Sequence, residues 1–144
     1  VGEILGLIRC FPYAAVVIED FVLDPDKFNT GRDLLSPVRL TSAISYDLWL
    51  QGRSHHVQSA SQAKSTCKDE VLKSWGFYNG HETRELRHAR DAYRHGLTFL
   101  KRAAAVSKQG YALRSLAWPH VFGPDGKYSE VKRALENQKM EASA

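Results

Sequence analysis

The chain of 144 residues has the length of one domain, and a chain of this size buries enough surface for a hydrophobic core without disulfides. Hydrophobic residues make up 43% and charged residues 25% of the sequence, which excludes a wholly disordered chain, a collagen-like chain and a disulfide scaffold. The formal net charge of +4 is mild, so its distribution along the chain carries more information than its size.

A helix and then a strand are predicted at the start of the sequence. Apolar residues at helical spacing predict an amphipathic helix that begins near residue 1 and ends around Pro12. The apolar run 14–18 contains β-branched residues and predicts a fully buried strand, as in a sheet with helices on both faces. The run ends at Glu19, and the turn-forming residues within 21–35 predict a loop.

The remainder of the sequence predicts mainly helices. The first predicted elements are a helix from Ser36-Pro37 to Gly52, a short strand over 55–59 and a helix within the polar segment 59–68. A short helix over 69–75, which Gly76 ends, and a loop over 77–82 follow. A long helix then runs from about 83 or 85 to Ser107, followed by turns at 118–119 and 123–126 and a polar helix-like tail over 129–140. The tail is expected at the surface or against a partner.

Helices that alternate with strands are typical of an α/β fold. Only two strands are evident, and two strands do not make a stable sheet beneath four helices. Either further strands are hidden in the chain, or more of the sheet precedes Val1. The buried first strand and the uncapped first helix favour the second explanation.

The sequence shows neither a membrane span nor a signal peptide. No apolar run approaches the roughly 20 residues that cross a membrane, and no basic leader precedes an apolar core. We therefore expect a cytoplasmic protein without a membrane partner, in which Cys10 and Cys67 are reduced thiols.

Charge is unevenly distributed along the chain. Residues 84–114 contain eight basic residues and two acidic ones. An acidic cluster lies elsewhere, at Glu19, Asp20, Asp24 and Asp26. A basic segment with a separate group of carboxylates suits a metal-dependent enzyme that acts on a polyanion. The same pattern also fits a solvated helix and an acidic loop.

Glu19 is the first candidate functional residue. It ends an apolar strand, and in open α/β sheets functional groups gather at the carboxyl ends of the strands. The alternative is that the strand simply ends there and that Glu19 faces water.

The second candidate group lies on the long helix, where His88, Asp91 and His95 share one face. That face continues into the apolar stripe of Ala92, Phe99, Ala103 and Val106. A carboxylate on a core-facing stripe must be paired or must hold a cation, so Asp91 is either a metal ligand or part of a structural pair with Arg or His. The arginines expected to point toward solvent or a ligand are Arg87, Arg90 and Arg94.

A strand-end Glu followed about 70 residues later by a His-x-x-Asp helix motif indicates a metal site. An oxygen-rich site of this kind selects Mg²⁺ or Mn²⁺. The sequence has no Cys or His spacing of a zinc site, no Gly-rich phosphate loop and no Gly-x-Ser-x-Gly elbow.

Three segments carry a resemblance to a known family. They are residues 16–21 (VVIEDF), 59–64 (SASQAK) and 88–92 (HARDA). Through them the sequence resembles the RuvC-like branch of the RNase H-like fold, the Holliday junction resolvases, and most of all their bacteriophage versions. The resemblance covers about residues 1–105. It implies an RNase H-like nuclease domain over 1–110, with a mixed sheet flanked by helices and without its N-terminal strands, and a C-terminal extension over 111–144.

The resemblance also implies roles for individual residues. Glu19 matches the second metal carboxylate of the family, and His88 with Asp91 matches its helix motif. The resemblance implies that Glu19 and Asp91 bind metal and that His88 completes the metal shell or positions the water. Lys64 matches a lysine that lies near the DNA backbone. No strand matches the one that carries the family's first carboxylate in an Asp-x-Gly context, so the chain resembles a resolvase that lacks its first segment.

The implied activity is hydrolysis of phosphodiester bonds in branched DNA by a homodimer that uses two Mg²⁺ or Mn²⁺ ions, in the cytoplasm of a bacterium or a phage-infected host. Lys64 and the arginines of the long helix would contact phosphates. His95 either supports the metal shell or packs in the core. Because one carboxylate is missing, the 144 residues alone are expected to cleave poorly unless Asp24 or Asp26 supplies it.

Two other functions stay open at this point. One is a catalytically silent nucleic-acid-binding module on the same fold. The other is an RNA-directed nuclease of that fold.

Overall fold

The computed structural model describes residues 1–21, 35–77 and 84–129. The helices and strands within these ranges are α1 (Gly2–Cys10), β1 (Val16–Asp20), α2 (Leu35–Leu50), β2 (His55–Ser59), α3 (Ala60–Thr66), α4 (Asp69–Ser74), α5 (Arg84–Ala104), α6 (Lys108–Ala117) and α7 (Pro119–Phe122). Most of the predicted loop over 21–35, the predicted loop beyond Phe77 and the predicted tail beyond Ser129 lie outside the described residues.

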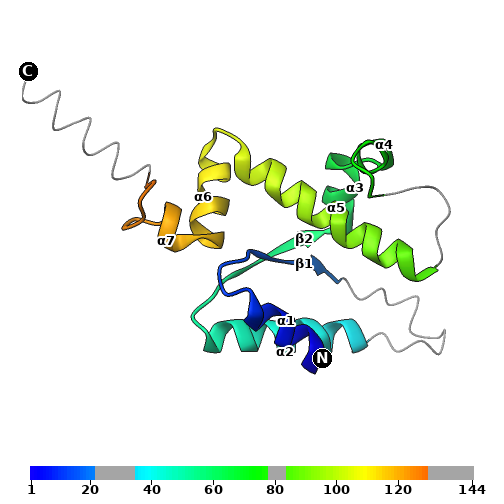
Figure 1. Ribbon diagram of the computed structural model, residues 1–144, viewed down its shortest axis with the longest axis horizontal. Helices are drawn as coiled ribbons and strands as arrows, with labels where there is room; N and C mark the ends of the chain where they lie inside the picture. The colour runs from blue at the N-terminus through cyan, green and yellow to red at the C-terminus, as the bar shows by residue number, and fades with distance from the viewer. Residues whose placement is uncertain (22–34, 78–83, 130–144) are drawn as a thin grey trace, which may run out of the picture.

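The two described strands form a parallel sheet with helices on both sides. Val16 pairs with His55 and Asp20 pairs with Ser59. Figure 1 shows α1 and α2 on one side of the sheet, and α3, α5 and α6 on the other. Helix α5 contacts β1, while α3 and α6 contact β2. The predicted α/β class is confirmed as a mostly helical fold around a small sheet.

The first strand differs from its prediction in position and in burial. It begins at Val16 and extends through Glu19 and Asp20, because these two residues continue the ladder with β2. The prediction of a fully buried strand is wrong, since Val16, Val17 and Ile18 are only half-buried. Within the described residues β1 has one neighbouring strand, so its other edge stays uncovered by the sheet.

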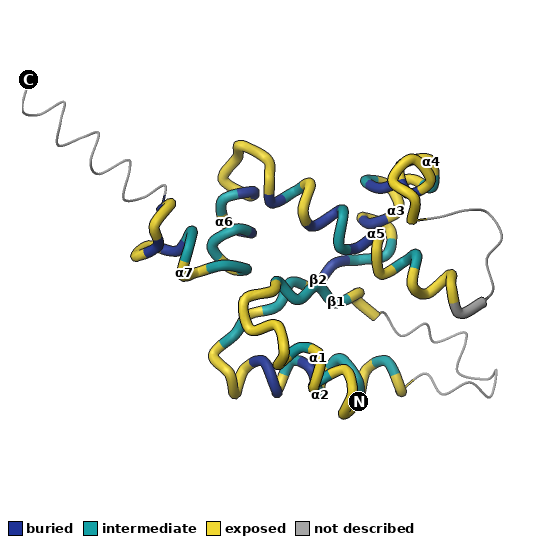
Figure 2. The backbone as a smooth tube through the Cα atoms, viewed as in Figure 1, coloured by how far each residue is buried: buried dark blue, intermediate teal, exposed yellow. Residues whose placement is uncertain are grey.

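The core lies between α5, α6 and the sheet. Phe99, Ala103 and Leu113 are buried, and Val17 and Trp118 pack against them. Figure 2 shows buried residues along α5 and where α3 and α6 meet it. The apolar stripe predicted for the long helix is thus confirmed at Phe99 and Ala103.

The residues at the two ends of this predicted stripe are not buried. Val106 is exposed because α5 ends at Ala104 and the chain turns back there, and Ala92 is exposed where it lines a cavity beside β1. Helix α6 begins after Ser107, whose side chain accepts a hydrogen bond from the Gly110 backbone at 3.1 Å. Sequence analysis missed α6, and the expected domain boundary after residue 110 falls inside it.

Helices α1 and α2 are joined by an ion pair between the exposed Arg9 and the buried Asp47. The Asp47 carboxylate is buried and accepts hydrogen bonds from Arg9 on α1 and from Gln51, the latter at 2.5 Å. These contacts, with Arg9 as the main cause, lower the pKa of Asp47. Arg53 donates to the carbonyl oxygens of Ile8 and Ala14, at 3.1 and 3.0 Å, and so fixes the chain between α1 and β1.

Neither cysteine forms a disulfide. Cys10 is exposed, and Cys67 is buried where α3 ends. Burial raises the pKa of the Cys67 thiol.

Candidate functional site

Strand β1 and helices α3 and α5 border a group of adjoining cavities. A cavity of about 400 Å³ is lined by Glu19, His88, Asp91 and His95, together with small and apolar residues. A cavity of about 30 Å³, roughly the volume of one water molecule, is lined by Glu19 and Asp91 again and by Lys64. The fold therefore brings the candidate carboxylates of β1 and α5 to the same two cavities.

Glu19 is held by a buried histidine on α5. Its Oε2 atom lies 3.4 Å from Nε2 of His95, while half of the Glu19 side chain remains exposed. On the other side of the imidazole ring, Nδ1 of His95 is 3.1 Å from the amide nitrogen of Gln58 on β2. Because that amide nitrogen is a donor, Nδ1 accepts, and the ring proton lies on Nε2 facing Glu19. His95 thus packs in the core and also positions Glu19.

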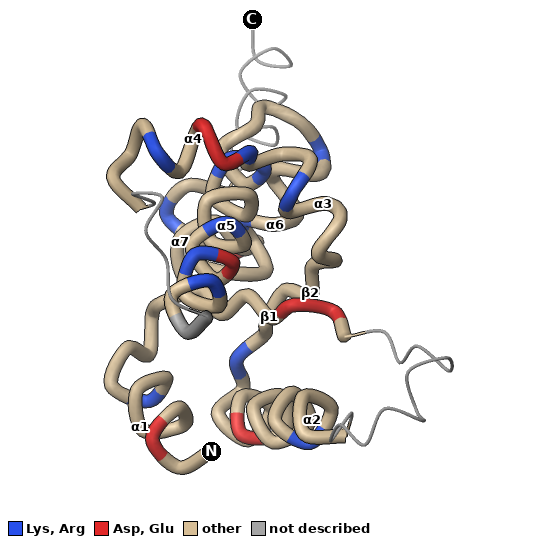
Figure 3. The backbone as a smooth tube through the Cα atoms, turned by 90° about the vertical axis from the view of Figure 1, so that its right-hand side faces the viewer, with Lys and Arg blue, Asp and Glu red and all other residues tan. Residues whose placement is uncertain are grey.

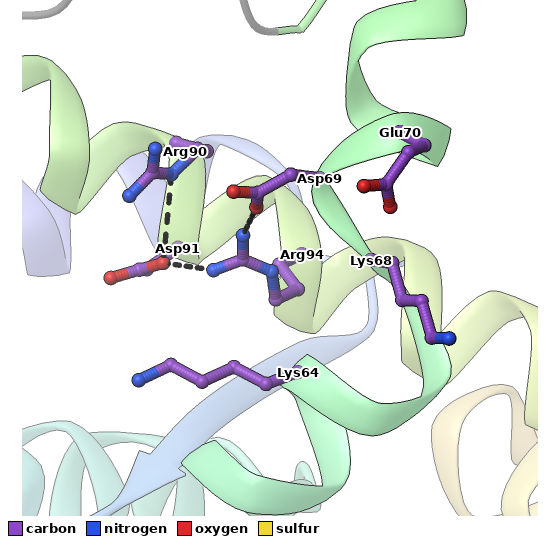
Figure 4. Close-up of a pocket in the computed structure, with 7 residues that line it drawn as sticks. All are labelled: Lys64, Lys68, Asp69, Glu70, Arg90, Asp91 and Arg94. Carbon is purple, nitrogen blue, oxygen red and sulfur yellow. Dashed lines mark hydrogen bonds and ion pairs between the residues drawn. The ribbon is translucent and has the colours of Figure 1, made fainter.

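Asp91 is already paired within the protein. Its Oδ1 atom accepts a hydrogen bond from Arg94 and lies 3.9 Å from Nε of Arg90. Figure 4 shows the other carboxylate oxygen pointing away from both arginines. Of the two alternatives for Asp91, the structural ion pair is therefore present, and one oxygen is left for another ligand.

Arg94, which was expected to point toward solvent or a ligand, is buried. Its side chain is 6% exposed, and its guanidinium group binds Asp69 and Asp91. Its Nε atom also donates to the carbonyl oxygen of Cys67 at 3.0 Å. Exposure to solvent is wrong because the junction of α3 and α4 lies over this face of α5 and supplies two of the three acceptors, the Asp69 carboxylate and the Cys67 carbonyl oxygen.

The remaining candidate residues are distributed around the cavities. His88 is exposed and lines the larger cavity one turn before Asp91. Lys64 is exposed on α3 and lines the smaller one. Arg87 is exposed and lines neither.

A third cavity of about 450 Å³ lies beside the small one and shares Lys64, Asp91 and Arg94 with it. Its full lining is Lys64, Lys68, Asp69, Glu70, Arg90, Asp91 and Arg94 (Figure 4). Figure 3 shows the molecule from the side on which the acidic end of β1 and the basic residues of α5 lie. Sequence analysis missed Lys68 and Asp69, whose only signal is their position beside the start of a short helix.

The donor atoms at the site fit a hard divalent cation in type but not in number. Carboxylate oxygens of the kind that Glu19 and Asp91 provide are the ligands that Mg²⁺ and Mn²⁺ prefer. In the part of the chain that the structure describes, no three His, Cys, Asp or Glu side chains are grouped closely enough to hold a metal ion. Asp24 and Asp26, the other candidates for a missing carboxylate, lie outside that part.

Comparison of the chain with protein-family models, with curated proteins and with solved structures finds no match.

The helices within residues 1–21, 35–77 and 84–129 include none with the length and apolar character that crossing a membrane requires.

Proposed function

We propose that the protein is a Mg²⁺- or Mn²⁺-dependent endonuclease that hydrolyses phosphodiester bonds in branched DNA, in the manner of RuvC-like resolvases of the RNase H-like fold. One observation carries the proposal. Glu19 and Asp91, which are far apart in the sequence, line the same two cavities beside β1 and α5, and Lys64 lines the smaller of them. Two carboxylates beside a lysine suit a phosphodiester and a divalent cation.

Each residue of the site has a distinct role in this proposal. Glu19 and Asp91 would provide two carboxylate ligands, and His88 lines the same larger cavity near them. With a divalent ion held by these carboxylates, the site would gain positive charge for the activation of water and the stabilisation of the leaving oxygen. His95 holds Glu19 in position, and Lys64 attracts the phosphate of the strand.

The proposal includes two partners. Branched DNA is the substrate, because the residues 16–21, 59–64 and 88–92 resemble the junction resolvases. A homodimer follows from the same resemblance, since symmetric cleavage of two strands needs two copies of one site.

The test replaces each carboxylate by its isosteric amide, in Glu19→Gln and Asp91→Asn. Single-turnover cleavage of a fluorescent four-way junction is measured with protein in excess and Mg²⁺ or Mn²⁺ saturating, so that slow cleavage is detected. Loss of one metal ligand is expected to lower the rate at least about 100-fold, with junction affinity changed by less than about twofold. Glu3→Gln, on the exposed surface of α1, serves as the control and keeps the wild-type rate.

If either amide variant cleaves at the wild-type rate, the carboxylate that it replaces is not a metal ligand of the active site. Flap, duplex and RNA substrates, measured under the same conditions, distinguish a junction resolvase from an RNA-directed nuclease of the same fold.

A catalytically silent nucleic-acid-binding module is the second candidate function. It is favoured by the ion pairs that Arg94 and Arg90 make with Asp91, which already satisfy one oxygen of that carboxylate. This candidate predicts junction binding that does not depend on Mg²⁺ or Mn²⁺, and no cleavage of any of the substrates above.

A further inference from the structure

The cavity of about 450 Å³ beside the carboxylates is built around a buried arginine. Arg94 joins α5 to the junction of α3 and α4 through Asp91, Asp69 and the carbonyl oxygen of Cys67. Its guanidinium group is therefore fixed in direction, and it is occupied by protein acceptors rather than free to bind a ligand.

The charges that line this cavity sum to a positive value. Four basic and three acidic side chains line it. Arg94 and Arg90 lie against Asp91, and Arg94 also pairs with Asp69, so these four groups balance one another. Lys64 and Lys68 then exceed the one remaining carboxylate, that of Glu70.

We propose that this cavity binds the phosphate backbone of a nucleic-acid strand through the cationic ends of Lys64 and Lys68. Arg94 acts as a positioning residue, because it neutralises the carboxylates of Asp69 and Asp91 that would otherwise repel the phosphate. The inference rests on the proposed function and adds to it a phosphate site next to the one that is cleaved.

The position and size of the cavity support this assignment. It adjoins the small cavity of Glu19, because Lys64 and Asp91 line both, so a strand bound in the larger cavity would lie next to Glu19. Its volume has room for a phosphate with its sugar. Figure 4 shows Lys64 extending toward the Asp91 side of the cavity and Lys68 toward the opposite side.

Charge variants at the exposed rim test the proposal without disturbing the core. Binding of a fluorescent four-way junction is measured by anisotropy in EDTA over a series of salt concentrations. Lys68→Gln is expected to weaken binding several-fold and to reduce the slope of log K against log salt by about 0.9, the value for one lost phosphate contact. Glu70→Gln is expected to tighten binding, because it removes a negative charge from the cavity. Lys108→Gln, an exposed lysine on α6 outside the cavity, is the matched control and leaves the slope unchanged.

The role of Arg94 needs a rescue experiment, since its removal also affects folding. Arg94→Gln is expected to weaken junction binding by exposing two carboxylates to the phosphate. Adding Asp69→Asn removes one of them and is expected to restore part of the affinity, which a purely structural role would not produce. Circular dichroism of each variant checks whether the fold is retained.

Two sources of phosphate are separated by competition with short strands that differ only at the 5′ end. Equal competition by phosphorylated and unphosphorylated strands assigns the cavity to an internal phosphodiester, and stronger competition by the phosphorylated strand assigns it to a terminal phosphate. An unchanged salt slope for Lys68→Gln together with unchanged affinity for Glu70→Gln would overturn the proposal. A protein that shows both binding changes but cleaves no substrate would refute the nuclease and leave the phosphate site standing.

Discussion

At the scale of single residues, the two candidate carboxylates are held by partners from the same helix. His95 contacts Glu19 across the space between α5 and β1, and Arg94 contacts Asp91 one turn along α5. Both partners are buried, whereas both carboxylates are partly exposed. The arrangement fixes the acidic groups while leaving them accessible to a ligand.

The surroundings of His56, on β2, change the pKa of its ring. Its ring packs against Phe99 with centroids 5.4 Å apart. Its Nε2 atom is buried and has no hydrogen-bond partner in the described part of the chain. Burial, and secondarily the charge of Arg102, lower the pKa of His56, so the folded protein holds this ring neutral.

The lowered pKa of His56 predicts a loss of stability in mild acid. The unfolded state binds the proton more readily, so the contribution of His56 is full above the unfolded pKa of about 6.5 and falls as pH decreases from there toward the folded pKa. Urea unfolding across this range is expected to show a weaker pH dependence in His56→Phe than in the wild type. His120→Gln, at an exposed position, keeps the wild-type dependence. A His56→Phe protein with the wild-type slope would contradict this account of His56.

At the scale of helices, α5 and α6 meet at a turn that has no room for an added side-chain carbon. A Cβ atom at Gly110 would lie 2.1 Å from the backbone oxygen of Ala105. Backbone cannot move aside as a side chain can, so the tight turn between the two helices requires glycine there.

Two glycine-to-alanine changes in these helices are expected to act in opposite directions. Gly110→Ala should lower the free energy of unfolding by about 1–3 kcal/mol through the clash with Ala105. Gly96→Ala, inside α5, meets nothing within 4 Å and should raise it by up to about 1 kcal/mol, because alanine loses less entropy in a helix. Chemical denaturation measures both, and a Gly110→Ala protein as stable as the wild type would show that this turn is not as tight as described.

At the scale of the whole molecule, the hydrophobic core continues past the boundary that the sequence suggested at residue 110. Leu113 on α6 is buried against Phe99 and Ala103 of α5, with Trp118 packed beside them. Residues on both sides of position 110 therefore share one core.

A pair of leucines on α6 tests this shared core. Leu113 is 7% exposed, and Leu113→Ala is expected to lower the free energy of unfolding by about 2–4 kcal/mol. Leu116 is 41% exposed, and Leu116→Ala is expected to cost less than about 1 kcal/mol. Equal effects of the two changes would mean that α6 lies outside the core.

The sequence by itself determined the local elements and their order. Strand β2 and helices α3 and α4 lie close to their predicted ranges, because their signals are local. Ser59 caps α3 through a hydrogen bond from Gln62, and Gly76 takes a positive φ of 77° after α4. The α/β class followed from the alternation of these elements. Helix α6 was missed although Ser107 caps it, since Gly110, a residue typical of helix ends, lies inside it.

Only the tertiary structure decided how charged residues pair. The sequence marked Glu19 and Asp91 as candidates, but it could not show that they line common cavities or that His95 faces Glu19. It predicted that Arg94 points toward solvent or a ligand, and it could not show that Asp69 from a different helix binds it. Whether a charged side chain is exposed depends on what other elements place opposite it. Such contacts join residues far apart in the sequence, where neither periodicity nor spacing carries information.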